Sequence, residues 1–351
     1  MGEPQSILVP LTPAAVFLVA TIDEGGEAAV RTLLTEVNDL RKSVGFRTPG
    51  QDLSCVTSIG SVAWDRLFTG PKPAELHEFP GYNGPVHTAP ATPGDLLFHI
   101  RAENMGTCYE LAMAIATRLR GAATVVDETH GFRYFEQRDL LGFVDGTANP
   151  EGAAAEASVF VGDKDPDFAF GSYVIVQKYL HPLDKWNALP IEEQERVIGR
   201  TKLSDYELPD DVKPPSSHVV MNTITDENGV EHDIVRANMP FGTIGDQQLG
   251  TYYIAYSATP TVTEKMLERM FLGTDQAAYD RILDFSTALT GTLFFTPSAD
   301  FFDALPAAPA VVATENPDVP VPDFEPVIEA NAAASGSDGS LAIGTMKRST
   351  R

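Results

Sequence analysis

The first half of the chain alternates between two patterns of apolar positions. Residues 15–20 are continuously apolar, which is typical of a buried strand. Residues 27–42 place apolar side chains three and four positions apart, which predicts an amphipathic helix. The same reasoning predicts strands at residues 53–59, 95–100, 123–126 and 132–135 and a helix at residues 106–120.

The second half repeats this order of elements, although the two halves share no visible sequence similarity. A strand is predicted at residues 173–176, and a helix follows at about residues 192–200. Two such units in series predict an α+β protein of two ferredoxin-like domains, which we place at residues 8–150 and 151–305. The remaining predicted elements are strands at residues 218–223, 232–236, 251–256 and 292–295 and a helix at residues 262–272.

The pattern changes again after the second predicted domain. Residues 306–326 contain six prolines, and residues 315–329 carry five acids and no base. Such a segment buries too little apolar surface to offset the entropy lost on ordering, so residues 306–337 are predicted to form a disordered linker. Residues 338–351 are apolar and basic instead. They indicate either a docking peptide at the end of a tether or a frayed terminus.

Composition and charge exclude several classes of protein. The 351 residues carry a formal net charge of −24, which disfavours binding to nucleic acids and to anionic membrane surfaces. No apolar run reaches the length of about 18 residues that a membrane helix needs. The N-terminus lacks the basic and apolar regions of a secretory signal, and Cys55 and Cys108 lie far apart. We therefore expect a cytoplasmic protein with reduced thiols.

Five polar residues stand out as candidates for chemistry, each with a plainer alternative. Asp145 lies among apolar residues and glycine, where burial would make it a proton acceptor, but Asp-Gly is also common in turns. His218 follows a proline-rich loop and is a candidate metal ligand or a structural histidine. Arg236 and Asn238 would share one face of a strand, as a cationic site or as a surface ion pair. Asp284 would orient a histidine or cap a helix.

The segment Gly142-Phe143-Val144-Asp145-Gly146 resembles the GxxDG signature of the dye-decolourising peroxidase family. Other pieces of that family's pattern follow in order, and the resemblance extends over roughly residues 10–300. It implies two ferredoxin-like domains packed as a dimeric α+β barrel, with one haem b per subunit in a cavity. The further matching pieces are residues 197–200, His218, residues 236–238 and residues 283–286.

The resemblance also implies a role for each candidate residue. His218 would be the proximal ligand of the haem iron, and Asp284 would accept a hydrogen bond from its other ring nitrogen. Asp145 and Arg236 would act on peroxide at the distal side, and Asn238 would position peroxide or a water molecule. The remaining cofactor-binding candidates are Arg200, beside a haem propionate, and Asn149, at the haem edge.

The C-terminal residues 338–351 resemble the cargo-loading peptide that directs such peroxidases into encapsulin shells, with Met346 where the usual pattern has leucine. Together these resemblances imply a haem peroxidase that reduces hydrogen peroxide and oxidises dyes or phenolic compounds. They also imply a dimer or hexamer inside an encapsulin compartment in the cytoplasm. The alternatives are a non-catalytic haem-binding protein or an iron-releasing cargo protein.

Overall fold

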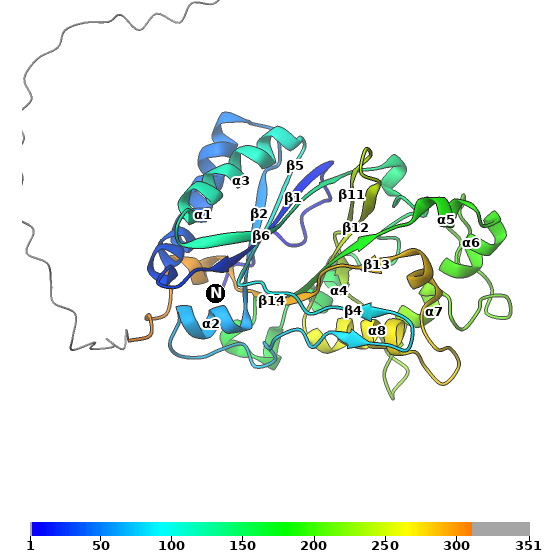
Figure 1. The fold of residues 1–351 in the computed structure, drawn as a ribbon. Helices are drawn as coiled ribbons and strands as arrows, with labels where there is room; N and C mark the ends of the chain where they lie inside the picture. The colour runs from blue at the N-terminus through cyan, green and yellow to red at the C-terminus, as the bar shows by residue number, and fades with distance from the viewer. Residues whose placement is uncertain (1, 311–351) are drawn as a thin grey trace, which may run out of the picture. The chain divides into compact units, whose positions relative to one another are not determined.

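The structure is a computed structural model, and it describes residues 2–310 (Figure 1). Residues 2–309 belong to one compact unit that contains every helix and strand described below. Most of the predicted linker at residues 306–337 and the whole of the predicted docking peptide at residues 338–351 lie outside the described residues. Among the described helices, none is long and apolar enough to cross a membrane.

The first half of the unit has the ferredoxin-like order of two strand–helix–strand repeats. Its four strands pair antiparallel in the order β2-β5-β1-β6, so the first and third strands of the repeat lie at the centre. The periodicity correctly predicted both long helices. The main elements are β1 (Ala14–Ile22), α1 (Glu27–Arg47), β2 (Ser54–Gly60), β5 (Leu96–Ala102), α3 (Met105–Leu119) and β6 (Ala123–Phe132).

The second half repeats this arrangement with the order β10-β12-β7-β14, and β11 also pairs with β12. Its longest helix, α8, packs against β7 and β12. The α+β class and the two ferredoxin-like halves are therefore as predicted. The main elements are β7 (Ser172–Leu180), α6 (Ile191–Ile198), α7 (His218–Asn222), β10 (Val235–Arg236), β11 (Met239–Thr243), β12 (Gln248–Ser257), α8 (Pro260–Leu272) and β14 (Thr292–Thr296).

Shorter elements connect these strands and helices. They are helices α2 (Ser61–Leu67), α4 (Gly152–Val159) and α5 (Leu183–Asn187), strands β3 (Tyr82–Asn83), β4 (Thr88–Ala89), β8 (Ile224–Thr225), β9 (Glu231–His232) and β13 (Thr287–Ala288), and 3₁₀ turns at Phe135–Gln137, Gly162–Lys164, Pro166–Phe168, Arg281–Phe285 and Ala299–Asp303.

The two halves join into one curled sheet (Figure 1). β14 pairs with β2, and at the other end of the sheet β11 packs beside β6. Alternate residues of each strand therefore face the inside of a barrel or the helices outside it. On β1, Phe17 and Val19 belong to the inner apolar cluster, whereas Val16 and Leu18 pack in the outer cluster with α1 and α3.

The structure corrects three sequence predictions. Where a strand was predicted at residues 218–223, His218–Asn222 form helix α7, because packing against α8 overrides the strand preference of Val219 and Val220. The strand predicted at residues 123–126 extends to Phe132 as β6, and of the strand predicted at residues 132–135 only Phe132 belongs to it. The strand predicted at residues 232–236 is divided into β9 and β10, and β11 was not predicted at all.

Both cysteines are reduced and lie away from the barrel interior. Cys108 is buried on α3, and Cys55 on β2 packs against the outer apolar cluster. Burial is the main cause that raises the pKa of each thiol to about 12.

Candidate functional site

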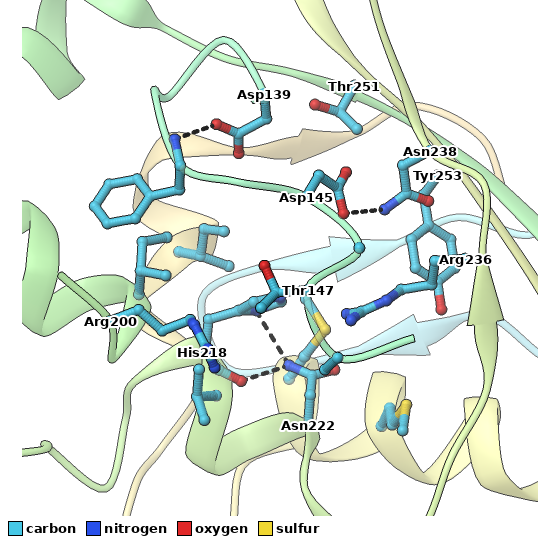
Figure 2. Close-up of a pocket in the computed structure, with 18 of the residues that line it drawn as sticks. Asp139, Asp145, Thr147, Arg200, His218, Asn222, Arg236, Asn238, Thr251 and Tyr253 are labelled. Atoms are coloured by element: carbon cyan, nitrogen blue, oxygen red, sulfur yellow. Dashed lines mark hydrogen bonds between the residues drawn. The ribbon is translucent and has the colours of Figure 1, made fainter. Parts of the chain in front are cut away.

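A large cavity lies on the outer face of the second half, between the sheet, helices α7 and α8 and the loop that carries the GxxDG segment. About 250 Å³ of it is accessible to the centre of a water molecule. Five of the candidates line it: Asp145, Arg200, His218, Arg236 and Asn238 (Figure 2). The walls are otherwise largely apolar, with contributions from Leu141, Phe143, Val144, Ile198, Val219, Ile234, Met266, Leu267, Met270 and Ile282.

His218 is held by a buried carboxylate. It opens helix α7, and its Nδ1 lies 2.7 Å from Oδ2 of Asp280, whose side chain is 0% exposed. Asn222, one turn later on the same helix, donates to the backbone oxygen of His218 at 2.8 Å. Ile282 N–H donates to the other carboxylate oxygen of Asp280 at 3.0 Å. Among the described residues, Nε2 of His218 has no hydrogen-bond partner, so it remains free to ligate a metal in the cavity.

The sequence analysis named Asp284 as the partner of His218, and this prediction is wrong, because the partner is Asp280. Asp284 instead contacts His87, at 3.3 Å, and accepts a hydrogen bond from Tyr279 at 3.2 Å. Both acids belong to the same 3₁₀ turn, but Asp280 stands at its N-cap and faces α7, whereas Asp284 lies a turn later. The N-cap preference of aspartate is the signal that could have distinguished them.

The GxxDG loop requires glycine at both ends. Gly142 and Gly146 have φ values of +92° and +85°, and a Cβ at Gly142 would lie 2.6 Å from Cε of Lys202. Arg138 fixes the loop from behind, because its Nη1 donates to the backbone oxygens of Gly142 at 2.9 Å and of Lys202 at 2.6 Å. The Asp145 N–H donates to Gln137 at 2.9 Å. These bonds place the Asp145 carboxylate at the cavity wall.

Asn238 presents its amide nitrogen to Asp145. Its Oδ1 accepts the Ile254 N–H at 3.0 Å, so the NH₂ group is the end that faces the carboxylate, and its Nδ2 donates to Oδ1 of Asp145 at 3.3 Å. The predicted pairing of Arg236 and Asn238 at the cavity therefore holds, although only Arg236 belongs to strand β10.

Arg236 points into the pocket with part of its guanidinium unpaired (Figure 2). Its Nε is buried and has no hydrogen-bond partner among the described residues. Its backbone is clamped by Asn149, whose Nδ2 donates to the Arg236 oxygen at 2.7 Å and whose Oδ1 accepts the Arg236 N–H at 3.0 Å. Asn149 does not line the cavity, so it acts on the site through Arg236 rather than at the edge of a ligand.

Arg200 lines the cavity but is already engaged. Its Nε donates to Oδ1 of Asp205 at 3.0 Å, and its Nη1 lies 3.6 Å from the Glu207 carboxylate. The Asp205 carboxylate also accepts a hydrogen bond from Thr147, on the GxxDG loop, at 2.6 Å. Arg200 therefore connects α6 and the loop after it to the distal wall. A ligand anion bound by Arg200 would share its guanidinium with Asp205 and Glu207.

Two cavity residues were missed by the sequence reasoning. Asp139 accepts the Phe143 N–H at 2.9 Å, and burial raises its pKa to about 7, with the nearby Asp145 charge adding to the shift. His181 contacts Thr251 through Nε2 at 2.9 Å, and burial lowers its pKa to about 4. No motif surrounds either residue in the sequence. Each lines the cavity only because of the path that the backbone takes in the fold.

The residues present fit a haem. One wall offers an imidazole with a free Nε2 and a carboxylate behind it, which is the arrangement that a metal-ligating histidine needs. The other wall offers the Arg236 guanidinium, which has no ion pair among the described residues, and the Asp145 carboxylate. The apolar side chains between them suit a porphyrin face, and the described residues contain no cluster of three His, Cys, Asp or Glu side chains that would hold a bare metal ion.

Comparison with known proteins agrees with this geometry. The N-terminal and C-terminal models of the Dyp-type peroxidase family match residues 4–133 and 136–301. A dye-decolorizing peroxidase of Rhodococcus erythropolis is 58% identical over 99% of this chain and 98% of its own length. One from Mycobacterium tuberculosis is 55% identical over 99% of this chain and 98% of its own.

Solved structures give the same result. The encapsulated DyP-type peroxidase of Mycobacterium smegmatis superposes with a TM-score of 0.87 at 61% identity, over 88% of this chain and all of that one. A DypB variant of Rhodococcus jostii in complex with heme gives 0.84 at 55% identity, over 86% of this chain and 98% of that one. With the two family models covering nearly all of the described residues, this chain belongs to the Dyp-type peroxidases and is a dye-decolourising haem peroxidase.

Proposed function

We propose that this enzyme reduces hydrogen peroxide and oxidises dyes or phenolic compounds at one haem b per subunit, held by His218. The observation that carries this proposal is the opposition, across one cavity, of the His218–Asp280 pair and the Asp145–Arg236 pair. When bound there, haem supplies an iron that coordinates peroxide and the electrons that cleave its O–O bond.

The His218–Asp280 pair would hold the iron. The Asp280 carboxylate accepts the Nδ1 hydrogen, which fixes the tautomer of His218 and directs the lone pair of Nε2 into the cavity. The negative charge behind the ring also raises the basicity of the ligand. The additional bond from Ile282 to Asp280 keeps the carboxylate from turning away. The proximal ligand therefore needs little reorganisation when the cofactor binds.

The distal residues would have separate roles: one transfers a proton on peroxide, and another stabilises the charge that develops on it. Asp145 takes a proton from the inner oxygen and delivers it to the outer one, which makes water the leaving group. Arg236 stabilises the negative charge that develops on that oxygen, because its guanidinium points into the pocket and no described residue pairs with its terminal nitrogens. Asn238 donates to Asp145 and keeps its carboxylate aimed at the cavity. Arg200 would contribute charge at the propionate side, shared with Asp205.

Replacing Arg236 tests this division of work. We expect Arg236→Leu to keep the haem absorption spectrum but to slow the reaction with peroxide about 10²–10³-fold, because one preorganised charge is lost from a dry site. The rate is measured by stopped-flow absorbance at the Soret band. Arg118→Leu, which removes an exposed arginine bonded to Glu36, is the matched control. An unchanged rate in Arg236→Leu would contradict the distal role and would favour a non-catalytic or iron-releasing haem protein.

We also propose that residues 338–351 direct the enzyme into an encapsulin shell. The support is the sequence of the peptide, whose Leu341, Ile343 and Met346 are spaced apolar anchors, and the encapsulated state of the Mycobacterium smegmatis relative. Deleting residues 338–351 is expected to leave peroxidase activity unchanged and to abolish co-purification with the shell protein. Packaging that survives the deletion would refute the assignment. We further propose that the enzyme assembles as a dimer or hexamer, as the family resemblance implies.

A further inference from the structure

A tyrosine, a histidine and a carboxylate meet at the surface of the second half. The Tyr279 hydroxyl donates to Oδ1 of Asp284 at 3.2 Å, and Nε2 of His87 lies 3.3 Å from the same oxygen. The rings of Tyr279 and His87 meet edge to face, with centroids 4.9 Å apart. All three side chains are half-buried, and none of them lines the haem cavity. We call these three residues the Tyr279 cluster.

The Tyr279 cluster is joined to the proposed haem ligand by a short path of bonds. Tyr279 directly precedes Asp280 in the chain, and Oδ2 of Asp280 lies 2.7 Å from Nδ1 of His218. One peptide unit and one hydrogen bond therefore connect the tyrosine with the imidazole that would hold the iron. Bonded atoms and short hydrogen bonds transfer single electrons more efficiently than gaps between side chains. An electron can thus pass from Tyr279 to the haem through Asp280 and His218.

The oxidation of a tyrosine also requires a proton acceptor, which Asp284 provides. Partial burial and the adjacent Asp284 carboxylate raise the pKa of Tyr279, so the phenol keeps its proton at neutral pH. A phenol that loses an electron becomes strongly acidic, and its proton then moves along the hydrogen bond to the carboxylate. Lys185 donates to the backbone oxygen of Asp284 at 3.0 Å and holds the acceptor in place.

The haem cavity leaves little room for a large reducing substrate. About 250 Å³ of it is accessible to the centre of a water molecule, and the haem itself would take up most of this space. A dye with several rings, or a phenol that is part of a polymer, is too large to enter beside the cofactor. Such a substrate needs a point of electron transfer on the surface.

We propose that Tyr279 is a surface site at which aromatic substrates too large for the cavity are oxidised, with Asp284 as its proton acceptor. This inference rests on the proposed function, because peroxide supplies the oxidising equivalents at the haem. First, Tyr279 loses one electron to the oxidised haem, and its proton passes to Asp284. The substrate then gives one electron to the tyrosyl radical, and the proton returns from Asp284 to the phenolic oxygen. Two such cycles return the two electrons that one molecule of peroxide has taken.

Two substrates of equal chemistry and different size test the proposal in the haem-loaded, full-length enzyme. They are a phenol free in solution and the same phenol coupled to dextran. Tyr279→Phe is expected to increase the ratio of kcat/KM for the free phenol to that for the coupled phenol about 10-fold, because only the coupled phenol depends on the surface site. The matched control is Tyr109→Phe, on α3, which removes another surface tyrosine that packs against a histidine, His130, and should leave the ratio unchanged.

Electron paramagnetic resonance detects the tyrosyl radical itself. Wild type that is mixed with one equivalent of peroxide and frozen within milliseconds, without a reducing substrate, is expected to show a tyrosyl signal. Tyr279→Phe should lose this signal, and Tyr109→Phe should keep it. Asp284→Asn should delay its appearance, because the amide cannot accept the proton.

The outcomes separate this proposal from the function on which it rests. An unchanged ratio of the two kcat/KM values in Tyr279→Phe, or a tyrosyl signal that persists in this variant, would overturn the surface site and leave the haem peroxidase intact. A wild-type Soret band that does not respond to peroxide would instead overturn the proposed function, and the surface site with it.

Discussion

The two walls of the cavity differ in how completely their polar groups are satisfied. On the wall that carries His218, the Asp280 carboxylate accepts hydrogen bonds on both oxygens, and its side chain is fully buried. On the opposite wall, the Arg236 Nε–H has no partner among the described residues, and Asp145 receives a single side-chain bond of 3.3 Å.

This difference assigns the two walls to two tasks: the His218 wall would hold the cofactor, and the Arg236 wall would react with peroxide. A saturated network costs free energy to disturb, so the His218 wall keeps one geometry whether or not a ligand is present. On the Arg236 wall the guanidinium has no hydrogen bond or ion pair to a described residue, so its terminal nitrogens can donate to an incoming oxygen. Both walls are nevertheless positioned by backbone clamps, through Ile282 for Asp280 and Asn149 for Arg236.

The largest expected effect comes from removing the ligand on the saturated wall. His218→Ala should purify without bound haem, and the Soret band should be lost. Two other histidines line the cavity, but His181 has both ring nitrogens hydrogen-bonded, and His232 contacts Asp226 and has no buried carboxylate behind its ring as His218 has. His87→Ala is the matched control, since His87 lies beside Asp284 and outside the cavity. If His218→Ala kept a normal haem spectrum, the assignment of the two walls would be wrong.

A smaller effect should separate the two acids of the 3₁₀ turn. Asp280→Asn is expected to slow the reaction with peroxide about 10–100-fold and to raise the haem reduction potential, because the charge behind His218 is lost. Asp284→Asn, four residues later, should leave both quantities near the wild-type values. Spectroelectrochemistry and stopped-flow absorbance measure the two effects. Equal behaviour of the two variants would show that the carboxylate does not act through His218.

The smallest expected effect is a change in pH dependence on the reactive wall. The pKa of Asp139 is raised to about 7 in the folded state, so the folded protein binds more protons than the unfolded chain between about pH 4 and 7. At this group, stability therefore falls as pH rises through that window. Asp139→Asn should unfold at the same temperature as wild type at acidic pH and about 2–4 °C higher at pH 8.

The control for this measurement is Asp39→Asn, on the exposed side of α1. Its unfolding temperature should differ from that of wild type by the same amount at every pH. A difference between Asp139→Asn and wild type that is constant from pH 4 to 8 would mean that Asp139 does not retain its proton in the folded protein.

The sequence predicted most of what depends on local pattern and least of what depends on packing. The helix at residues 27–42 and the strand at residues 15–20 follow directly from apolar spacing, and both are present. Asp145, His218 and Arg236 were identified because ordered motifs surround them. Asp280 was not, because two acids four residues apart look alike until the turn that begins at Asp280 is seen against α7.

The position of Asn149 is a second example of a contact that the sequence could not predict. Its motif placed it near the cofactor, but its amide pairs with both backbone groups of Arg236, 87 residues away. A contact over that separation has no local signature. Strand β11 was also missed, since Gly242 and Pro240 weaken the strand pattern that pairing with β12 nevertheless enforces.

The raised pKa of the two cysteines has a consequence for an enzyme whose substrate is an oxidant. Peroxide attacks the thiolate form of cysteine, and a thiol with a pKa of about 12 is almost wholly protonated at neutral pH. Cys55 and Cys108 should therefore resist sulfenic acid formation during turnover. Packing in the outer apolar cluster thus protects the thiols of Cys55 and Cys108 from oxidation by the enzyme's own substrate.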